Sequence, residues 1–541
     1  MKKVTPVLCI LAVLMSLFLT VHADGNQPYE LYLKRVDNNT GLMVMGFVKG
    51  TTPDSKYELV IPAEADYYYD DNMQKCELSK PLPVTSVISG AFAYTDATCE
   101  KYFDENPVTK ITFSGSNLKT IGRTDVASLT GEVGSALEKK YVFYRTGNIN
   151  TVDIPDSVTR VNRLFTLCPI EEINLGKGIT SLGSGCLNNM TKTLRISTYA
   201  STFESTLSFT LIRQLEELRL CADSLNLSGK FNLVGLEGGN ADKLKIYTKS
   251  SALKSKLVSL GYPSNNVYEH LPVDTVYDFG GNYTLKVTLF PSLKTARING
   301  FEKLPDCFTD LNIPEKISFD GEEYTTTEIK NNAFNSDIAN SGAVFVRNLN
   351  LPDTVKKIGN NAFRGCSHMN YAYVAGAEDI STCAFKGCNE LYRVELGEGL
   401  KAISSEMFYD TRAMTSLVVP STVTSFSCNA VATSRKLNSV AILGENVDFS
   451  GTTLNGIGSA RLKDEIKFFV RNEATKNKLI ALLGDTAYSI KVTDSGSKTL
   501  TLYDGYGWGI ADVLRRYVGY IAVVACKVDR QISAFRVDRR S

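Results

Sequence analysis

The second half of the chain repeats an apolar pattern about every 23 residues, and this spacing constrains the fold more than any other feature. The residues expected to end successive strands stand at intervals of 23, 22, 23 and 23, and they are Leu351, Val374, Leu396, Val419 and Ile442. A small-plus-large pair keeps the same phase at intervals of 22, 23 and 23, as Ala362-Phe363, Ala384-Phe385, Met407-Phe408 and Ala430-Val431. Two markers in one phase indicate a structural repeat in which each unit rebuilds a buried layer.

Each repeat contains a short alternating strand, a turn with Gly, Pro or Asp, and a second apolar pair. One such unit cannot bury its apolar face alone, so the units must stack. We expect their strands to pair in parallel, about 4.8 Å apart, around one continuous core. In that core Phe363, Phe385 and Phe408 fill the volume, while Ala362 and Ala384 allow the backbones to approach closely.

The first half carries a looser version of the same pattern, with strand markers at intervals of 21, 21, 24 and 26. These markers are Ile154, Leu175, Ile196, Leu220 and Ile246. Both halves then close with similar segments, Asp242 to Tyr262 and Asp464 to Gly484. Each segment is typical of a final strand followed by an amphipathic helix, which shields the last layer of a repeat array.

The predicted fold is therefore a repeat solenoid built from two tandem arrays of parallel strands with short helical caps. The first array spans residues 24–271 and the second spans residues 272–492, each with a β-rich opening cap and a helical closing cap. Residues 1–23 form a separate leader, and the tail at residues 493–541 fits neither pattern, so we assign it no role.

The N-terminal sequence indicates export. Lys2 and Lys3 precede an apolar run from Val7 to Leu19, and Val21 to Ala23 form a small-residue cleavage pattern. The run is shorter than the ~20 residues that a membrane-spanning helix needs, so we expect a cleaved signal peptide and no transmembrane segment in the mature protein. The 59 Lys and Arg residues balance 58 Asp and Glu residues, so no overall field exists to recruit nucleic acid.

Eleven of the twelve cysteines follow the predicted cleavage site, so at least one thiol is unpaired or joins two chains. Cys76 and Cys99 form the candidate disulfide of the opening segment. Cys366 and Cys388 occupy one repeat position, where the geometry of neighbouring strands allows a disulfide. Because the next repeat places Thr411 there, we expect these two cysteines to be buried core residues with inert thiols.

Signals for catalysis, cofactors and metals are weak. The chain has three histidines, of which His22 leaves with the signal peptide while His270 and His368 fall in different arrays. A catalytic triad needs partners within hydrogen-bond reach, and a histidine-rich metal site needs more histidines. Phosphate-binding glycine motifs and CxxC pairs are absent from the sequence, and no carboxylate pair stands out among the acidic residues. We expect no enzyme activity, cofactor or metal site.

The stretch DYYYDDN from Asp66 to Asn72 offers three aromatic rings beside carboxylates. Tyr67, Tyr68 and Tyr69 are candidate contacts for a sugar or a protein, because tyrosine combines an apolar ring with a hydrogen-bonding hydroxyl. The spacing of the carboxylates matches no calcium-binding loop. The alternative interpretation is a twisted strand that ends in a solvated turn.

Three stretches resemble the BspA-like leucine-rich-repeat family of bacterial cell-surface proteins: IPDSVTRV from Ile154, LPDTVKKIGNNAFRGC from Leu351, and CAFKGCNELYRVELGEGLKAI from Cys383. The resemblance covers roughly residues 85–490. It implies a right-handed solenoid on a secreted or surface-attached protein, with adhesion to host proteins or other cells in some members. The first array departs from the family pattern, because Leu164-Phe165 and Cys186-Leu187 replace its AF and GC elements. No lipid-attachment or cell-wall sorting motif is visible, so the mode of surface retention stays open.

These observations favour a noncatalytic, secreted or surface-attached bacterial protein that mediates adhesion or ligand binding. The partners we expect are host extracellular or cell-surface proteins, mucins or other glycans, or other cells. Two alternatives stay open: an enzyme or an accessory protein in glycan processing with an acidic site in a loop, and a structural spacer at the cell surface.

Overall fold

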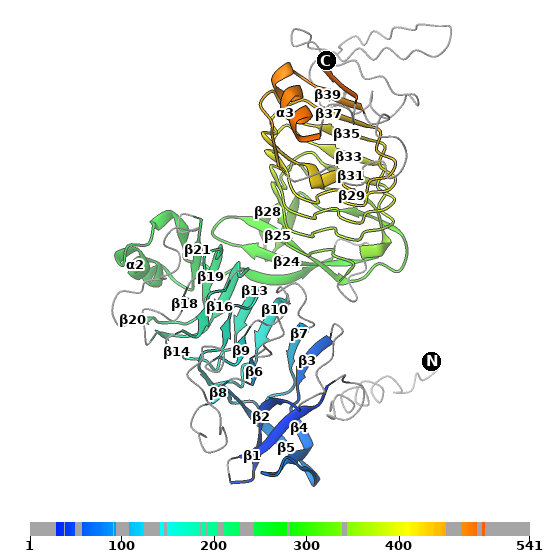
Figure 1. Cartoon of the computed structure of the whole chain (residues 1–541). Coiled ribbons are helices and arrows are strands. Elements are labelled where there is room, and N and C mark those ends of the chain that lie inside the picture. Colours follow the sequence, from blue (N-terminus) through cyan, green and yellow to red (C-terminus); the bar gives the residue numbers. More distant parts are fainter. Residues whose placement is uncertain are drawn as a thin grey trace, which may run out of the picture. The chain divides into compact units, whose positions relative to one another are not determined.

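The chain divides into two compact units, Met1–Leu271 and Pro272–Ser541, and each is described by itself (Figure 1). The computed structural model describes residues 27, 29–36, 38–48, 57–89, 91–93, 108–123, 141–144, 149–183, 185–190, 192–203, 209–210, 212–227, 243–278, 282–337, 343–450, 467–483 and 489–492. The predicted signal peptide and the C-terminal tail lie outside these residues.

The first unit opens with a six-stranded sheet in the order β1-β2-β5-β8-β11, in which β4 also pairs with β5. Its strands are β1 (Leu31–Val36), β2 (Gly41–Phe47), β4 (Glu64–Tyr69), β5 (Lys75–Ile88), β8 (Thr120–Arg123) and β11 (Arg160–Val161). The β1–β2 and β4–β5 pairs are antiparallel, whereas β2–β5, β5–β8 and β8–β11 are parallel. Strands β3 (Tyr57–Ile61) and β7 (Val108–Phe113) form a separate parallel pair. The opening thus changes from hairpins to the parallel pairing that the repeats use.

The repeats of the first unit form three parallel sheets. The largest runs β10 (Ile149–Ile154), β13 (Ile170–Leu175), β16 (Arg195–Thr198), β19 (Glu217–Leu220), β21 (Lys245–Thr248) and β22 (Val267–Tyr268). The second contains β6 (Phe92–Ala93), β9 (Phe143–Tyr144), β12 (Phe165–Thr166), β15 (Leu187–Asn188) and β18 (Phe209–Thr210), and the third contains β14 (Ser181–Leu182), β17 (Thr202–Phe203) and β20 (Asn226–Leu227). Each repeat contributes one strand to a sheet, as expected for a solenoid.

The register of these strands corrects two of the aligned markers, Ile196 and Ile246. Ile246 pairs with Leu218, and the partner of Leu220 is Thr248. Ile196 pairs with Ile173, and the partner of Leu175 is Thr198. Thr198 is fully buried and its hydroxyl accepts a hydrogen bond from the Ala200 N–H at 3.1 Å. Since a threonine ends the strand here, apolar residues alone did not reveal the register.

The second unit repeats this plan with more regular turns. Its opening sheet contains β23 (Val273–Tyr277), β24 (Thr284–Phe290), β25 (Thr295–Lys303), β27 (Lys316–Phe319), β28 (Glu322–Ile329), β30 (Lys357–Ile358) and β32 (Asp379–Ile380). Three parallel sheets follow. The first contains β26 (Thr309–Asn312), β29 (Val346–Asn350), β31 (Tyr371–Val374) and β33 (Arg393–Leu396), and the second contains β34 (Ala402–Ile403), β36 (Ser425–Ser427) and β38 (Asp448–Ser450). The third contains β35 (Ser416–Val419), β37 (Ser439–Ile442), β39 (Lys467–Val470) and β40 (Ser489–Val492). Figure 1 shows β29, β31, β33, β35, β37 and β39 on successive turns of one stack.

Both units close with the strand and helix that the sequence predicts. In the first unit β21 is followed by α2 (Ser251–Ser259), whose N-terminus is capped by the Ser250 hydroxyl, which accepts from the Leu253 N–H at 3.4 Å. In the second unit β39 is followed by α3 (Glu473–Leu483). One further parallel strand follows each helix, β22 or β40, which the sequence comparison did not reveal. Short 3-10 turns, η4 (Ser264–Asn266), η5 (Ala343–Phe345) and η6 (Cys428–Val431), complete the described elements.

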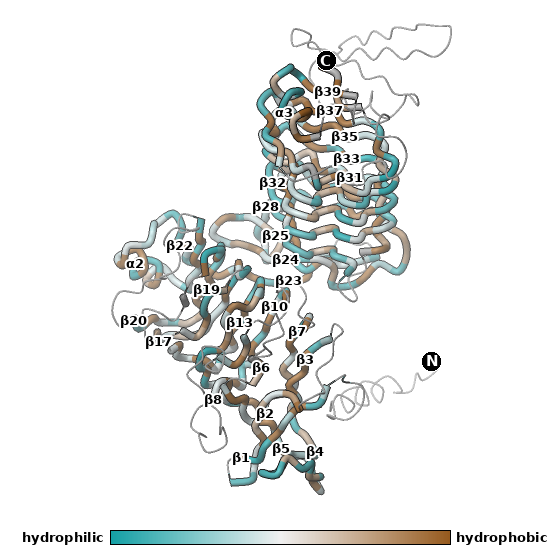
Figure 2. Tube along the Cα trace, viewed as in Figure 1, coloured by the Kyte–Doolittle hydropathy of each residue, from teal (hydrophilic) through white to brown (hydrophobic). Residues whose placement is uncertain are grey.

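A column of phenylalanine rings runs through the core of the second unit, as predicted. Phe334, Phe363, Phe385 and Phe408 are fully buried and belong to one core cluster. Successive ring centroids lie 5.3, 5.4 and 5.7 Å apart, with interplanar angles of 6°, 10° and 14°. Figure 2 shows the alternation of apolar and polar residues along these turns. The stacked-repeat architecture inferred from the sequence is therefore confirmed.

The residue two positions before each of these phenylalanines has a left-handed backbone. The φ angles are 57° at Asn332, 53° at Asn361, 58° at Cys383 and 53° at Glu406. Asparagine tolerates this conformation better than most non-glycine residues, because its short side chain forms local hydrogen bonds. The second asparagine of NNAF is therefore a turn residue, a role that the periodicity of the buried residues does not reveal.

This periodic turn predicts opposite effects for two substitutions. Asn361→Ala should lower the free energy of unfolding by about 1 kcal/mol, whereas Cys383→Asn should raise it by a similar or smaller amount, because asparagine suits the left-handed backbone better than alanine or cysteine does. Hydrogen exchange of the amides around each turn would measure both changes. Shifts of the same sign would show that side-chain contacts, and not backbone conformation, decide these positions.

Candidate functional site

Within the described ranges, no group of three or more His, Cys, Asp or Glu side chains could hold a metal ion. His270 Nε2 lies 4.0 Å from Glu269 Oε1 in the first unit, and His368 Nδ1 lies 3.1 Å from Glu390 Oε1 in the second. Both pairs are exposed, with 44–60% of each side chain accessible. They are exposed surface contacts of small energetic weight.

Two of the three candidate tyrosines on β4 lie in the core. Tyr67 is 2% exposed and its hydroxyl donates to the Leu31 carbonyl at 3.3 Å. Tyr69 is 6% exposed, and burial together with a hydrogen bond to Glu30 raises its pKa to about 12. Tyr68 is half-buried on the other face, with the Arg35 guanidinium carbon 4.3 Å from its ring centroid. A ligand contact through Tyr68 stays a prediction, whereas Tyr67 and Tyr69 stabilise the opening cap.

The predicted disulfide of this cap stays a prediction as well. Cys76 is half-buried on β5, and its Sγ donates to the Gln74 carbonyl at 3.6 Å. Cys99 lies outside the described residues. Cys366 and Cys388 are fully buried in the second core, where the sequence places them.

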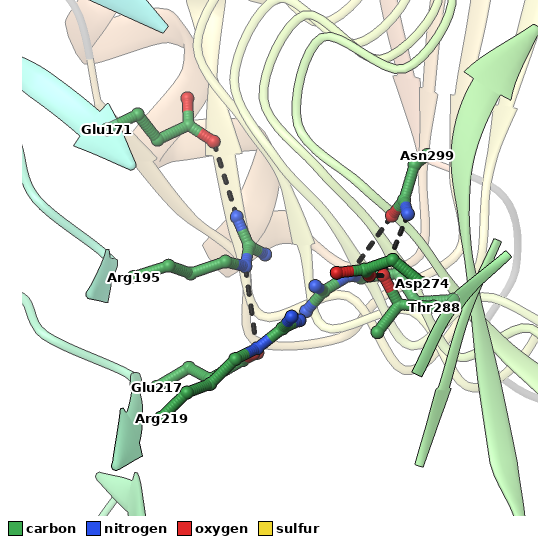
Figure 3. Close-up of polar contacts among 8 residues, drawn as sticks. Glu171, Arg195, Glu217, Arg219, Asp274, Thr288 and Asn299 are labelled. Atoms are coloured by element: carbon green, nitrogen blue, oxygen red, sulfur yellow. Dashed lines mark hydrogen bonds and ion pairs between the residues drawn. The ribbon is translucent and has the colours of Figure 1, made fainter. Parts of the chain in front are cut away.

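Opposite charges line neighbouring strands of the first unit (Figure 3). Arg195 Nη1 lies 3.4 Å from Glu171 Oε1, and Arg195 Nε lies 3.8 Å from Glu217 Oε2. Glu217 Oε1 also pairs with Arg219 Nε at 2.6 Å. Arg195, Glu217 and Arg219 are buried. Because a buried charge needs a partner, this ladder is best explained as mutual compensation between three strands.

A second polar group in Figure 3 joins the three antiparallel strands that open the second unit. Thr288 Oγ1 donates to Asp274 Oδ1 at 2.5 Å, and Asn299 Nδ2 donates to Thr288 Oγ1 at 2.8 Å. Arg297 Nε donates to Asn299 Oδ1 at 3.3 Å. These bonds cross from β23 to β24 and β25, so they support the order of the strands in the opening sheet.

The outward face of β31 and β33 carries a cluster of Tyr371, Tyr373, Arg393 and Glu395, here called the tyrosine–arginine cluster. Glu395 is 2% exposed, and its Oε1 accepts from the Tyr371 hydroxyl and from Arg393 Nη2, both at 2.8 Å. The Arg393 guanidinium carbon lies 5.7 Å from the Tyr371 ring centroid. A buried carboxylate thus holds one ring and one guanidinium in place on a rigid sheet, which reduces the entropy lost when they bind a partner.

Beside the starts of these strands lies an exposed aromatic surface formed by Phe308, Arg347, His368 and Tyr392, here called the rim cluster. Phe308 is 46% exposed and Tyr392 is 54% exposed. The His368 ring lies 5.1 Å from the Phe308 ring, and the Arg347 guanidinium carbon lies 4.9 Å from it. The Asn370 N–H donates to the Arg347 carbonyl at 2.7 Å, and the Tyr392 N–H donates to the Asn370 carbonyl at 3.0 Å. These bonds place the segments with Arg347, Asn370 and Tyr392 on three consecutive turns.

The rim cluster was missed at the level of sequence because its members come from four separated segments. Their places relative to the strands differ as well, since Phe308 and Tyr392 immediately precede β26 and β33 whereas Arg347 lies within β29. Aromatic rings and arginine are the residue types that dominate the energetics of protein interfaces. The arrangement suits recognition, since it combines exposed rings with positive charge on a rigid scaffold.

Residues 139–230 and 304–438 match the family model described as the BspA type leucine rich repeat region, in 6 copies. These two stretches are thus leucine-rich repeats of the BspA type, and the resemblance inferred from the sequence is confirmed. Leucine-rich repeats of this kind generally bind other proteins and generally carry no enzyme activity. No curated protein matches the chain at a significant level.

Several solved structures are similar to this chain. The pneumococcal vaccine antigen PcpA is 16% identical and aligns over 87% of this chain and 98% of its own, with a TM-score of 0.25. A leucine-rich repeat protein from Bacteroides ovatus is 13% identical over 87% of this chain and 100% of its own, with a TM-score of 0.26. A leucine rich cell surface protein from Faecalibacterium prausnitzii is 12% identical over 86% of this chain and 98% of its own, with a TM-score of 0.28.

None of the helices in the described part of the chain has the length and apolar character that a membrane-spanning helix requires.

Proposed function

We propose that this protein is an exported, noncatalytic bacterial protein that binds protein partners outside the cell, and that the rim cluster is its contact surface. The observation that supports this most is the exposed Phe308 ring against the Arg347 guanidinium, with Tyr392 exposed two turns further along the same stack. Exposed large apolar residues gathered in one place mark interaction sites more often than scattered ones do. The repeat family supports binding as the general role.

The tyrosine–arginine cluster extends this surface onto the sheet. Tyr371 starts β31 and Arg393 starts β33, and Tyr392 immediately precedes Arg393. A partner on the rim therefore meets the half-buried ring of Tyr371 and the guanidinium of Arg393 as well. The hydrogen bonds of both groups to Glu395 hold them in place before the partner arrives.

The small size of this surface favours binding by many copies. Six short stacked strands present a sheet face on the order of 500 Å². This is less than the ~800 Å² that each partner contributes to a standard stable interface. A single contact should be weak, and display of many copies on a cell surface would raise the overall affinity through effective concentration.

The test is a binding screen with the full chain immobilised at high and low density against host matrix proteins, mucins and a glycan panel. For a protein that binds, the double variant Arg347→Ala with Tyr392→Ala should weaken the affinity about tenfold or more, since buried Arg and Tyr contacts often carry 1–2 kcal/mol or more each. Phe319→Ala is the matched control, because Phe319 is a 38%-exposed ring on β27 outside the rim cluster.

Equal losses with the double variant and with Phe319→Ala would contradict the placement of the contact surface. Binding to the glycan panel alone, unaffected by the double variant, would instead support the alternative role in glycan processing. No binding to any member at high density would overturn the proposed function.

A further inference from the structure

Cys366 and Cys388 lie side by side in neighbouring turns of the second core. Each stands three residues after a phenylalanine of the column, and the rings of Phe363 and Phe385 are 5.4 Å apart. The Gly365 N–H donates to the Lys386 carbonyl at 2.7 Å, just before the two cysteines. Both side chains are fully buried and both thiols are free.

The same position in the next two turns shows how close such side chains come. Thr411 and Ser434 occupy it there, and their hydroxyl oxygens lie 2.9 Å apart. Side chains at this position in consecutive turns therefore reach each other. In agreement, the pKa of the Cys366 thiol is raised by burial and by the neighbouring Cys388 thiol.

The hydrogen bonds at this position do not require sulfur. Cys366 Sγ donates to the Phe334 carbonyl at 3.4 Å, and Cys388 Sγ donates to the Phe363 carbonyl at 3.2 Å. Ser434 Oγ donates to the Phe408 carbonyl at 3.1 Å in the same way. A hydroxyl is a stronger donor than a thiol, so packing and hydrogen bonding alone would be met by serine or threonine.

We propose that Cys366 and Cys388 form a dithiol that oxidises to a disulfide and thereby joins two neighbouring turns of the solenoid. Strands in one sheet lie about 4.8 Å apart, which falls inside the range of roughly 4.4 to 6.8 Å between the Cα atoms of bridged cysteines. To form this bond, the two sulfur atoms give up only weak hydrogen bonds.

The oxidant is a small disulfide that acts by thiol–disulfide exchange. The thiolate of one cysteine attacks the small disulfide and releases one small thiol. The thiolate of the other cysteine then attacks the mixed disulfide, forms the Cys366–Cys388 bond and releases the second small thiol. The two cysteines lose two electrons and two protons, and the small disulfide gains them. Because both thiols are buried, the reaction needs local opening of these turns or takes place before the core closes during folding.

Cys168 provides an internal control. It occupies the same position in the first unit, three residues after Phe165, and its Sγ donates to the Phe143 carbonyl at 3.4 Å. The next turn, however, places Met190 at this position, and Met190 is fully buried. Because the next turn has no cysteine at the equivalent position, we expect Cys168 to form no such bond within the unit.

The experiment uses the full chain carrying Cys383→Asn. Trypsin cleaves after Arg364 and Lys386, so Cys366 and Cys388 fall on different peptides, and the substitution removes the second cysteine of the Cys366 peptide. The reduced protein is refolded from urea with oxidised glutathione, unreacted thiols are blocked with N-ethylmaleimide, and the peptides are mapped without reduction. We expect the two peptides to be linked, Cys168 to carry the blocking group, and the Tm of the oxidised protein to exceed that of the reduced protein by about 5 °C or more.

Cys388→Ser in the same background reproduces the hydroxyl that Ser434 supplies, so this variant should fold and should show no rise in Tm on oxidation. Absence of the linked peptide after refolding, where both thiols are accessible, would overturn the proposal. The proposal would also be overturned if the two peptides were linked but the oxidised protein had a lower Tm than the reduced protein, since the bond would then strain the repeat.

Discussion

Replacing Phe385 with alanine is expected to lower the free energy of unfolding of the second unit by about 3–5 kcal/mol. Phe385 is fully buried and stacks between Phe363 at 5.4 Å and Phe408 at 5.7 Å. Neither ring can close the gap, because the N–H of Phe363 and that of Phe408 each donate a backbone hydrogen bond to the following turn, which fixes both residues in place. The lost transfer free energy is therefore added to the cost of a cavity inside the column.

Hydrogen exchange of slowly exchanging amides in β31, β33 and β35 measures this change without interference from the first unit. The control is Tyr392→Ala, which removes an aromatic ring of similar size at 54% exposure and should change the same amides by less than about 0.5 kcal/mol. If Phe385→Ala cost no more than this control, the phenylalanine column would not be the element that holds the turns together.

Gly397→Ala should destabilise the second unit by about 3 kcal/mol, although it adds a single methyl group. A Cβ at this position would lie 1.6 Å from the Ala375 carbonyl oxygen of the preceding turn. That atom belongs to the backbone, so the clash can be relieved only by moving one turn of the stack against the next. The close approach of the turns, and not a special backbone angle, explains the glycine.

Gly399→Ala is the matched control two residues further along. A Cβ there would meet the Cγ of Glu378 at 2.9 Å, and this flexible side chain can move aside. We expect a change within about 0.5 kcal/mol, measured by the same exchange experiment. Equal costs at the two positions would show that glycine is needed here for a reason other than the spacing of the turns.

The repeated core was predictable because burial in a solenoid is periodic. A turn of 22 or 23 residues must return an apolar strand and a large ring to the same layer, so Phe363, Phe385 and Phe408 could be assigned from spacing alone. The first unit was harder, since a buried threonine at Thr198 took the place of an apolar strand end and shifted the apparent register. The strands β22 and β40 were missed because they are short and follow the closing helices.

The candidate site was less predictable. The tyrosine run on β4 suggested a surface, but alternate side chains of a strand point to opposite faces, and the face with Tyr67 and Tyr69 is covered. The rim cluster gave no sequence signal, since Phe308, Arg347, His368 and Tyr392 are separated by 39, 21 and 24 residues and differ in type. Only the pairing of turns shows that they are neighbours.

Sequence by itself determined the length of the repeat, the residues of the second core, the helical caps and the repeat family. It could do so because each of these depends on a pattern that every turn must satisfy to bury its apolar face. Only the folded structure shows which tyrosines are covered, that the exposed Phe308 ring meets Arg347, and that Cys366 and Cys388 adjoin as free thiols. These outcomes depend on the lateral register between turns, which is set by backbone hydrogen bonds between residues more than twenty positions apart and leaves no periodic mark in the sequence.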